Sequence, residues 1–387
     1  MRGLQACKFL LAARFLGPEQ VGLVGIALIC LAIAEGMSDT GLSQAVVQNK
    51  RSLNRWQAGA VWTLQLSRGL VIALGLFLLS TPIAWAFGAT SATGLVALAG
   101  IVALLRNSLN PGLFVAQRNR NFRKLSIYEV SAAVVDITTT LLLIRAGMGP
   151  ASVLLGSVAG ESSKLLMTWS WFRVSIKPTV QWRLIAPFTS FGKWIWGSSV
   201  ITLVLNQLDK ILVAKLLGTT EFGFYQVASR VAQLVVADAS VALGQYLYPT
   251  LSHRHRMSKS DAKSYFARVL LFIVPVLIVV SGLLMIFAPW LIATFIGQKW
   301  QSAVSILRVL SLAMLFGGVI ALLVSYARAV GQPQIVTRAA AFQLAALALL
   351  APILIWKFGA IGMAWATTGA LFVSVIYLAL RTKAHVS

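Results

Sequence analysis

Apolar segments long enough to cross a membrane recur along the whole chain of 387 residues. A helix needs about 20 mainly apolar residues to span the hydrocarbon core of a bilayer. A short apolar run at 3–16 precedes eleven longer ones. The longer runs cover 20–47, 57–86, 93–116, 127–146, 150–172, 189–215, 222–250, 267–295, 302–327, 336–356 and 360–380. Because backbone groups in lipid must be satisfied within the segment, we predict an all-α polytopic membrane protein of about twelve transmembrane helices.

The composition excludes other classes of protein. Hydrophobic residues make up 58% of the chain and charged residues only 11%, whereas soluble domains carry about 25% charged residues. This balance excludes a soluble enzyme, a disordered chain and a fibrous repeat. With two cysteines and three histidines, the chain cannot supply a disulfide framework or a Cys/His metal cluster, so we expect no metal and no cofactor.

The positive charge of the chain, +23, is distributed unevenly between alternate loops. Eighteen basic residues fall in one set of connections and in the tail, and the other loops hold at most one each. The set is Lys50, Arg51, Arg55, Arg118, Arg120, Arg123, Lys124, Arg173, Lys177, Arg183, Arg254, Arg256, Lys259, Lys263, Arg328, Arg338, Arg381 and Lys383. The positive-inside rule places this set and both termini in the cytoplasm. The charge therefore indicates orientation and contact with membrane lipid, and we expect no nucleic-acid partner.

The sequence also contains an internal repeat. The segment 14–22 resembles 215–223, and 102–106 matches 304–308 at nearly the same offset. A duplication of six helices fits the twelve runs, and an even number makes the two halves a parallel repeat. We therefore predict an N-terminal six-helix lobe at 1–183 and a C-terminal six-helix lobe at 184–387.

The same repeat predicts a shortened first helix. The run that starts near residue 189 opens the second half, and its counterpart would start before residue 1. The first helix is therefore expected to lack about a dozen residues. An apolar extension upstream in the parent reading frame would confirm this prediction.

Four segments resemble a known family. They are 14–23 (RFLGPEQVGL), 38–45 (SDTGLSQA), 120–125 (RNFRKL) and 206–218 (NQLDKILVAKLLG). They look like the Wzx-type flippases of bacterial polysaccharide export, within the multidrug/oligosaccharidyl-lipid/polysaccharide superfamily, and the resemblance covers nearly the whole chain. It implies two six-helix bundles around a central cavity in the bacterial cytoplasmic (inner) membrane.

The resemblance also implies a function. Such proteins move an undecaprenyl-pyrophosphate-linked oligosaccharide repeat unit from the cytoplasmic to the periplasmic leaflet by alternating access. The polymer would be O-antigen, capsule or exopolysaccharide. The lipid-linked oligosaccharide is the implied substrate, and a polysaccharide polymerase and the chain-length machinery are further expected partners.

Charged residues inside the apolar runs indicate where a site would lie. An Arg, Lys or Asp at the centre of a span costs about 2.5–3.5 kcal/mol, so it usually faces a cavity or a partner. The candidate substrate-binding residues are Arg68, Arg106, Lys210, Arg230 and Arg308. Arginine suits a pyrophosphate because its guanidinium binds two oxygens at once. The alternative for each cation is pairing with a carboxylate or reaching to the lipid headgroups.

Fewer carboxylates lie in the runs. Glu35, Asp39, Asp209 and Asp238 are candidates for ion coupling or for balancing a nearby cation. Glu161 and Lys164 are spaced for a simple ion pair on one helical face. Proton coupling, sodium coupling and uncoupled transport all stay open.

Three other functions compete with the flippase. A multidrug or cation exporter of the same superfamily would need a negative cavity, whereas cations at least equal carboxylates in these runs. A flippase for a lipid-linked peptidoglycan precursor is a second alternative. A membrane enzyme would be expected to carry a large periplasmic loop, but the connections on that side are short. The sequence has no nucleotide-binding motif, so we expect neither an enzyme nor direct ATP coupling.

Overall fold

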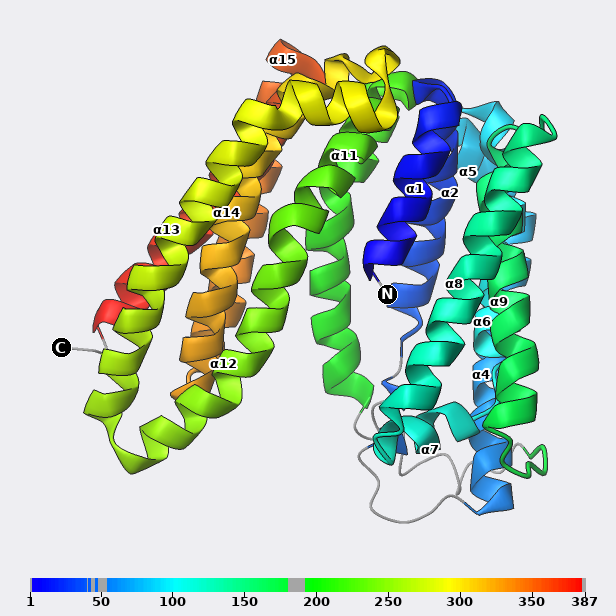
Figure 1. The fold of residues 1–387 in the computed structure, drawn as a ribbon, viewed down its shortest axis with the longest axis horizontal. Coiled ribbons are helices and arrows are strands. Elements are labelled where there is room, and N and C mark those ends of the chain that lie inside the picture. Colours follow the sequence, from blue (N-terminus) through cyan, green and yellow to red (C-terminus); the bar gives the residue numbers. More distant parts are fainter. Residues whose placement is uncertain (1, 40, 43–45, 48–53, 180–191, 385–387) are drawn as a thin grey trace. The chain divides into compact units, whose positions relative to one another are not determined.

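A computed structural model describes residues 2–39, 41–42, 46–47, 54–179 and 192–384. All regular structure in these residues is helical, as Figure 1 shows. The α-helices are α1 (Arg2–Phe15), α2 (Pro18–Met37), α4 (Arg55–Leu78), α5 (Ser80–Ala86), α6 (Thr93–Asn107), α7 (Gly112–Arg118), α8 (Phe122–Arg145), α9 (Ala151–Trp171), α11 (Gly192–Ala232), α12 (Asp238–Met257), α13 (Lys259–Leu291), α14 (Ser302–Ala329) and α15 (Pro333–Ala384). Short 3₁₀ turns (Thr90–Ala92 and Gln298–Trp300) and π-helical turns (Gln233–Ala237 and Ile292–Ile296) connect or extend them.

Each of the twelve predicted runs lies mostly on helix. The helix α15 contains two of the predicted runs, and α11 contains one run and the start of the next. In each helix, a glycine with non-helical backbone angles separates the two runs. Gly218 has a φ of +83° and Gly359 a φ of +58°, a region that L side chains rarely adopt. By length and composition, seven helical segments of the described residues are long and apolar enough to cross a membrane. The chain is a multi-pass membrane protein.

The chain divides into two compact units. The first unit covers Gly3–Thr220 and the second Glu221–Ser387. The predicted boundary between residues 183 and 184 lies outside the described residues. The first unit contains the helices α1 to α9 and α11 as far as Thr220, and the second contains the rest.

In the first unit, local sequence signals set the helix ends, and glycines set the packing distances. The Asn54 side chain accepts a hydrogen bond from the Gln57 backbone N–H at 2.8 Å, and the Gln57 side chain accepts one from the Asn54 backbone N–H. This capping box begins α4. On α9, Gly156 and Gly160 face α8. A Cβ at Gly160 would lie 2.8 Å from that of Asp136, so only glycine allows the two helices this approach.

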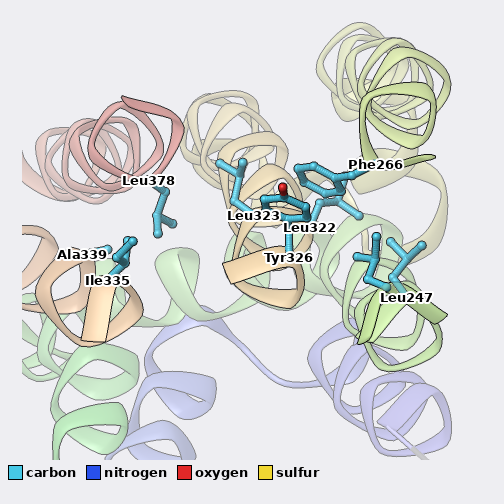
Figure 2. Packing of buried hydrophobic residues seen from close by; sticks show 9 residues of the cluster. Leu247, Phe266, Leu322, Leu323, Tyr326, Ile335, Ala339 and Leu378 are labelled. Atoms are coloured by element: carbon cyan, nitrogen blue, oxygen red, sulfur yellow. The ribbon is translucent and has the colours of Figure 1, made fainter. Parts of the chain in front are cut away.

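The second unit is held by a core of apolar side chains from α12, α13, α14 and α15 (Figure 2). Phe266 and Tyr326 stack in it with ring centroids 4.3 Å apart. Other large apolar side chains point outward, and Leu271 and Phe272 on α13 are both 70% exposed. Such outward apolar faces are what a helix in contact with lipid requires.

Candidate functional site

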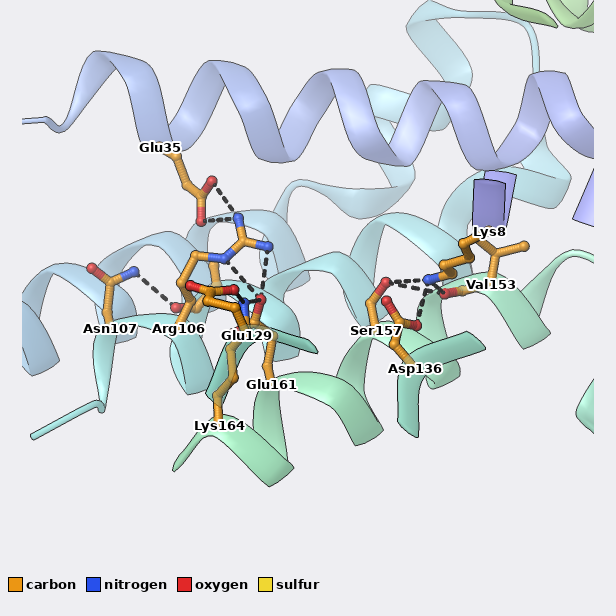
Figure 3. Close-up of polar contacts among 11 residues, drawn as sticks. Lys8, Glu35, Arg106, Asn107, Glu129, Asp136, Val153, Ser157, Glu161 and Lys164 are labelled. Carbon is orange, nitrogen blue, oxygen red and sulfur yellow. Dashed lines mark hydrogen bonds and ion pairs between the residues drawn. The ribbon is translucent and has the colours of Figure 1, made fainter. Parts of the chain in front are cut away.

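Seven charged side chains of the first unit gather inside its helices (Figure 3). We refer to them as the charge network. They come from α1, α2, α6, α8 and α9, and they are Lys8, Glu35, Arg106, Glu129, Asp136, Glu161 and Lys164. Charges within membrane-spanning helices are costly unless they are paired. Every member of this group has an oppositely charged partner.

Lys8 ties α1 to α8 and α9. Its ammonium nitrogen lies 2.6 Å from a carboxylate oxygen of Asp136 on α8. It also donates hydrogen bonds of 2.8 Å to the carbonyl of Val153 and to the hydroxyl of Ser157 on α9. An ammonium has three donors, so these three oxygens use all of them. The Lys8 side chain is 8% exposed, which makes this the most enclosed cation of the charge network.

Arg106 on α6 binds two carboxylates at once. Its Nη1 donates to both oxygens of Glu35 on α2, at 3.0 and 2.8 Å. Its Nε and Nη2 donate to one oxygen of Glu161 on α9, at 3.3 and 3.2 Å. The Arg106 side chain is 40% exposed, Glu35 22% and Glu161 only 7%. The guanidinium therefore has one buried partner and one that lies nearer the surface.

Lys164 completes the charge network. Its nitrogen lies 3.3 Å from Glu129 on α8 and 3.5 Å from Glu161 on its own helix, the latter as the i, i+3 spacing predicts. The charge network thus joins three cations to four carboxylates. Arg106 is a neutralised cation in this arrangement.

Arg68 on α4 reaches the end of α2. Its Nη2 donates to the backbone carbonyl of Glu35 at 2.6 Å, and its Nε donates to the hydroxyl of Ser38 at 2.9 Å. The last carbonyls of a helix lack partners within the helix, so Arg68 caps this end. Two predicted arginines therefore meet at Glu35, one on its backbone and one on its carboxylate. Asp39 makes a local contact, in which its carboxylate accepts a hydrogen bond from the backbone of Gly41 at 3.0 Å.

The other predicted residues lie elsewhere. Lys210 on α11 donates to the carbonyl of Asn206 at 3.0 Å, and its neighbour Asp209 is half-buried. In the second unit, Arg308 on α14 is exposed and donates to the carbonyl of Met285 at 3.3 Å, and Arg230 is half-buried. The side chain of Asp238 is outside the described part of the structure.

A cleft of about 380 Å³, including its part open to solvent, lies between α1, α8 and α9. Its polar lining comes from the charge network, one glutamine and one serine. These residues are Gln5, Lys8, Glu129, Asp136, Ser157, Glu161 and Lys164. Among the described residues, no group of three or more His, Cys, Asp or Glu side chains could hold a metal ion.

Lys8 and Asp136 were not among the predicted site residues. Each is a charge well inside an apolar run, at 3–16 and 127–146 respectively, and this was the available signal. The sequence could not show that they meet, because the partners are far apart along the chain.

Helices of spanning length with paired charges inside them define a polytopic membrane protein. A family model described as "Polysaccharide biosynthesis protein" matches residues 11–305, and the chain belongs to this family. The lipopolysaccharide biosynthesis protein WzxC of Escherichia coli (strain K12) is 22% identical over 311 residues, covering 80% of this chain. The chain spans 63% of the length of that curated relative.

Solved structures show the same fold. The lipid II flippase MurJ, in an inward closed conformation, superposes with a TM-score of 0.76 at 17% identity, covering 99% of this chain and 85% of MurJ. A multidrug resistance transporter of the MATE family of the MOP superfamily, in an inward-facing conformation, gives a TM-score of 0.77 at 16% identity. That match covers 99% of this chain and 95% of the transporter. The chain therefore has the two-lobed fold of these two proteins.

Proposed function

We propose that this protein transfers an undecaprenyl-pyrophosphate-linked oligosaccharide from the cytoplasmic to the periplasmic leaflet of a bacterial inner membrane, for polysaccharide biosynthesis. The observation that carries this proposal is the family match over residues 11–305. Similarity to a lipopolysaccharide biosynthesis protein and to a lipid II flippase supports a lipid-linked substrate. Both termini would be cytoplasmic, and a polysaccharide polymerase and the chain-length machinery would act on the product.

The chemistry of the first unit supports a substrate that carries phosphate. A pyrophosphate cannot cross the hydrocarbon core without compensating charge or hydrogen bonds. Arg106 is partly exposed and presents two adjacent donor groups, a geometry that suits phosphate oxygens. In the proposal, Arg68, Arg106, Lys210, Arg230 and Arg308 bind substrate. Glu35, Asp39, Asp209 and Asp238 balance charge or couple transport to an ion.

Alternating access would move two lobes, at 1–183 and 184–387, against each other. The parallel sequence repeat and the glycine corners at Gly218 and Gly359 support this proposal. The site lined by these charged residues would then open first to the cytoplasmic side of the membrane and afterwards to the periplasmic side.

The proposal is tested by expressing the chain in a strain that cannot flip its own lipid-linked repeat units. Surface polysaccharide and the leaflet of the accumulated glycolipid are scored. We expect recovery with the parent chain, loss of recovery with Arg106→Gln, and full recovery with Arg145→Gln, a matched change of an exposed arginine on α8. Equal activity of Arg106→Gln and the parent would contradict the placement of substrate, and no recovery by a stably inserted chain would contradict the function.

A cation exporter is the second candidate, because the cleft between α1, α8 and α9 is lined by three carboxylates and two lysines. The fold similarity to a MATE transporter agrees with it. Efflux of a cationic dye from the same cells separates the two functions. Growth of cells depleted of their lipid II flippase tests the peptidoglycan-precursor alternative in the same way.

A further inference from the structure

The exposed edge of Arg106 is already occupied by a carboxylate of the chain itself. Nη1 of Arg106 lies 2.8 and 3.0 Å from the two oxygens of Glu35. Two oxygens of a phosphate group would be held at the same edge by the same donors, because carboxylate and phosphate present similar acceptor pairs to a guanidinium. Glu35 therefore stands where an anionic ligand of Arg106 would bind.

The two carboxylates on Arg106 differ in how firmly they are placed. Glu161 is 7% exposed, and it bonds the Nε and Nη2 side of the guanidinium. Glu35 is 22% exposed and is in the last turn of α2, which ends at Met37. A negative charge near a helix C-terminus is disfavoured by the helix dipole. Glu161 is therefore the fixed anchor of Arg106, and Glu35 is the exchangeable partner.

A second arginine, Arg68, contacts the same residue, Glu35. Arg68 bonds the backbone carbonyl of Glu35 and the hydroxyl of Ser38, so its charge remains available to an incoming anion. An anion that replaced the Glu35 carboxylate would meet Arg106 directly, and Arg68 would still hold the backbone of Glu35. Release of the carboxylate would leave the end of α2 with one contact fewer to α6.

We propose that Glu35 is an internal competitor for the phosphate of the substrate. Its carboxylate neutralises Arg106 when no ligand is bound, and a phosphodiester or pyrophosphate displaces it. This inference rests on the proposed function and adds a regulatory role to one residue of that site. The ligand chemistry is shared by two sources, a prenyl pyrophosphate and a phospholipid headgroup.

A competitor role and a purely structural role for Glu35 predict opposite changes in the affinity of Arg106 for an anion. Replacing Glu35 by glutamine removes the competing charge, so it should tighten the binding of an anion to Arg106. Loss of a structural ion pair would instead loosen the site and weaken binding. A part-exposed pair of this kind predicts a gain of up to about fivefold in affinity.

The test uses the full chain, purified in detergent, with geranylgeranyl pyrophosphate as the probe and phosphatidylglycerol in a separate arm. We expect Glu35→Gln to bind the pyrophosphate up to about fivefold more tightly than the parent, and Arg106→Gln to lose the binding. Glu19→Gln is the matched control, because Glu19 is an exposed acid on the same helix. Its affinity should equal that of the parent. Glu35→Asp keeps the charge on a shorter side chain and should give an intermediate affinity.

The outcomes separate the two proposals. If Glu35→Gln and Glu35→Asp bind no more tightly than the parent while Arg106→Gln loses binding, the competitor role is wrong and the phosphate site stands. If all variants bind alike, both the competitor role and the placement of phosphate at Arg106 are wrong. The same order of affinities with phosphatidylglycerol alone would keep the competition and identify a membrane lipid as the ligand.

Discussion

Lys8 offers a sharp test of whether the charge network holds the first unit together. The substitution Lys8→Met keeps the length of the side chain and removes the ammonium. Asp136 then loses its 2.6 Å partner, and the carbonyl of Val153 and the hydroxyl of Ser157 each lose a donor. The close packing of α8 on Gly156 and Gly160 leaves Asp136 little room to move to another partner.

The size of the effect follows from these contacts. An unpaired aspartate within a span costs about 2.5–3.5 kcal/mol. An interhelical hydrogen bond in a membrane protein contributes about 0.6 kcal/mol, so the charge outweighs the two lost hydrogen bonds. Together they predict a loss of about 3.7–4.7 kcal/mol in the free energy that keeps α1 packed on α8 and α9. The population of the opened unit should then rise by roughly 500- to 3000-fold.

The chain supplies its own probe for this opening. Cys30 on α2 is buried in the first unit at 7% exposure, and the other cysteine, Cys7, is exposed. In a Cys7→Ser background, the rate of maleimide labelling at Cys30 reports how often the unit opens. We expect Lys8→Met to raise this rate by about three orders of magnitude. Lys124→Met, which changes an exposed lysine on α8, should leave it unchanged.

The double variant Lys8→Met with Asp136→Asn checks the physical reason. If the cost comes from an uncompensated carboxylate, removing that charge should restore most of the protection of Cys30. A labelling rate for Lys8→Met within about threefold of the parent would refute the reasoning. So would a double variant that labels faster than Lys8→Met alone.

Substitutions at three positions test the fold. Asn110 is fully buried, and its amide accepts from the backbones of Gly112 and Val174 and donates to the carbonyl of Val174. Asn110→Ala should therefore cost about 2–4 kcal/mol in thermal unfolding experiments, and Asn110→Asp should cost at least as much, because it buries an unpaired charge against the Val174 carbonyl. Gly218→Ala should destabilise by about 1–3 kcal/mol because of its positive φ, whereas Gly317→Ala, at a helical position with open space around it, should be neutral or stabilising. Equal melting temperatures for Gly218→Ala and Gly317→Ala would contradict this difference.

The helices were predictable because lipid imposes a strong rule on sequence. Each apolar run must satisfy its own backbone hydrogen bonds in lipid, so the limits of the run in the sequence predict the limits of a helix. The two matching segments of the repeat, 14–22 and 215–223, each contain a glycine where one helix meets the next. Gly17 ends the link between α1 and α2, and Gly218 forms the corresponding kink in α11 at the offset of the repeat.

The contacts of the site were only partly predictable. The spacing of Glu161 and Lys164 gave their ion pair, because i, i+3 residues share a helical face. The pairing of Arg106 with Glu35, 71 residues away, depends on how α2 and α6 are rotated and which helices are neighbours. Apolar runs carry little of that information, since lipid-facing and protein-facing sides are both apolar. Lys8 was missed for the same reason.

Transfer of the lipid-linked substrate between leaflets is the central claim, and it can be measured directly. The purified chain is reconstituted in liposomes with an undecaprenyl-pyrophosphate-linked sugar carrying a fluorophore, and the fraction accessible to an external quencher is followed over time. The proposal predicts rapid exchange of the fluorophore between leaflets with the parent chain, and exchange at the rate of protein-free liposomes with Arg106→Gln. Parent liposomes that exchange no faster than protein-free ones, with the protein folded and inserted, would contradict the claim.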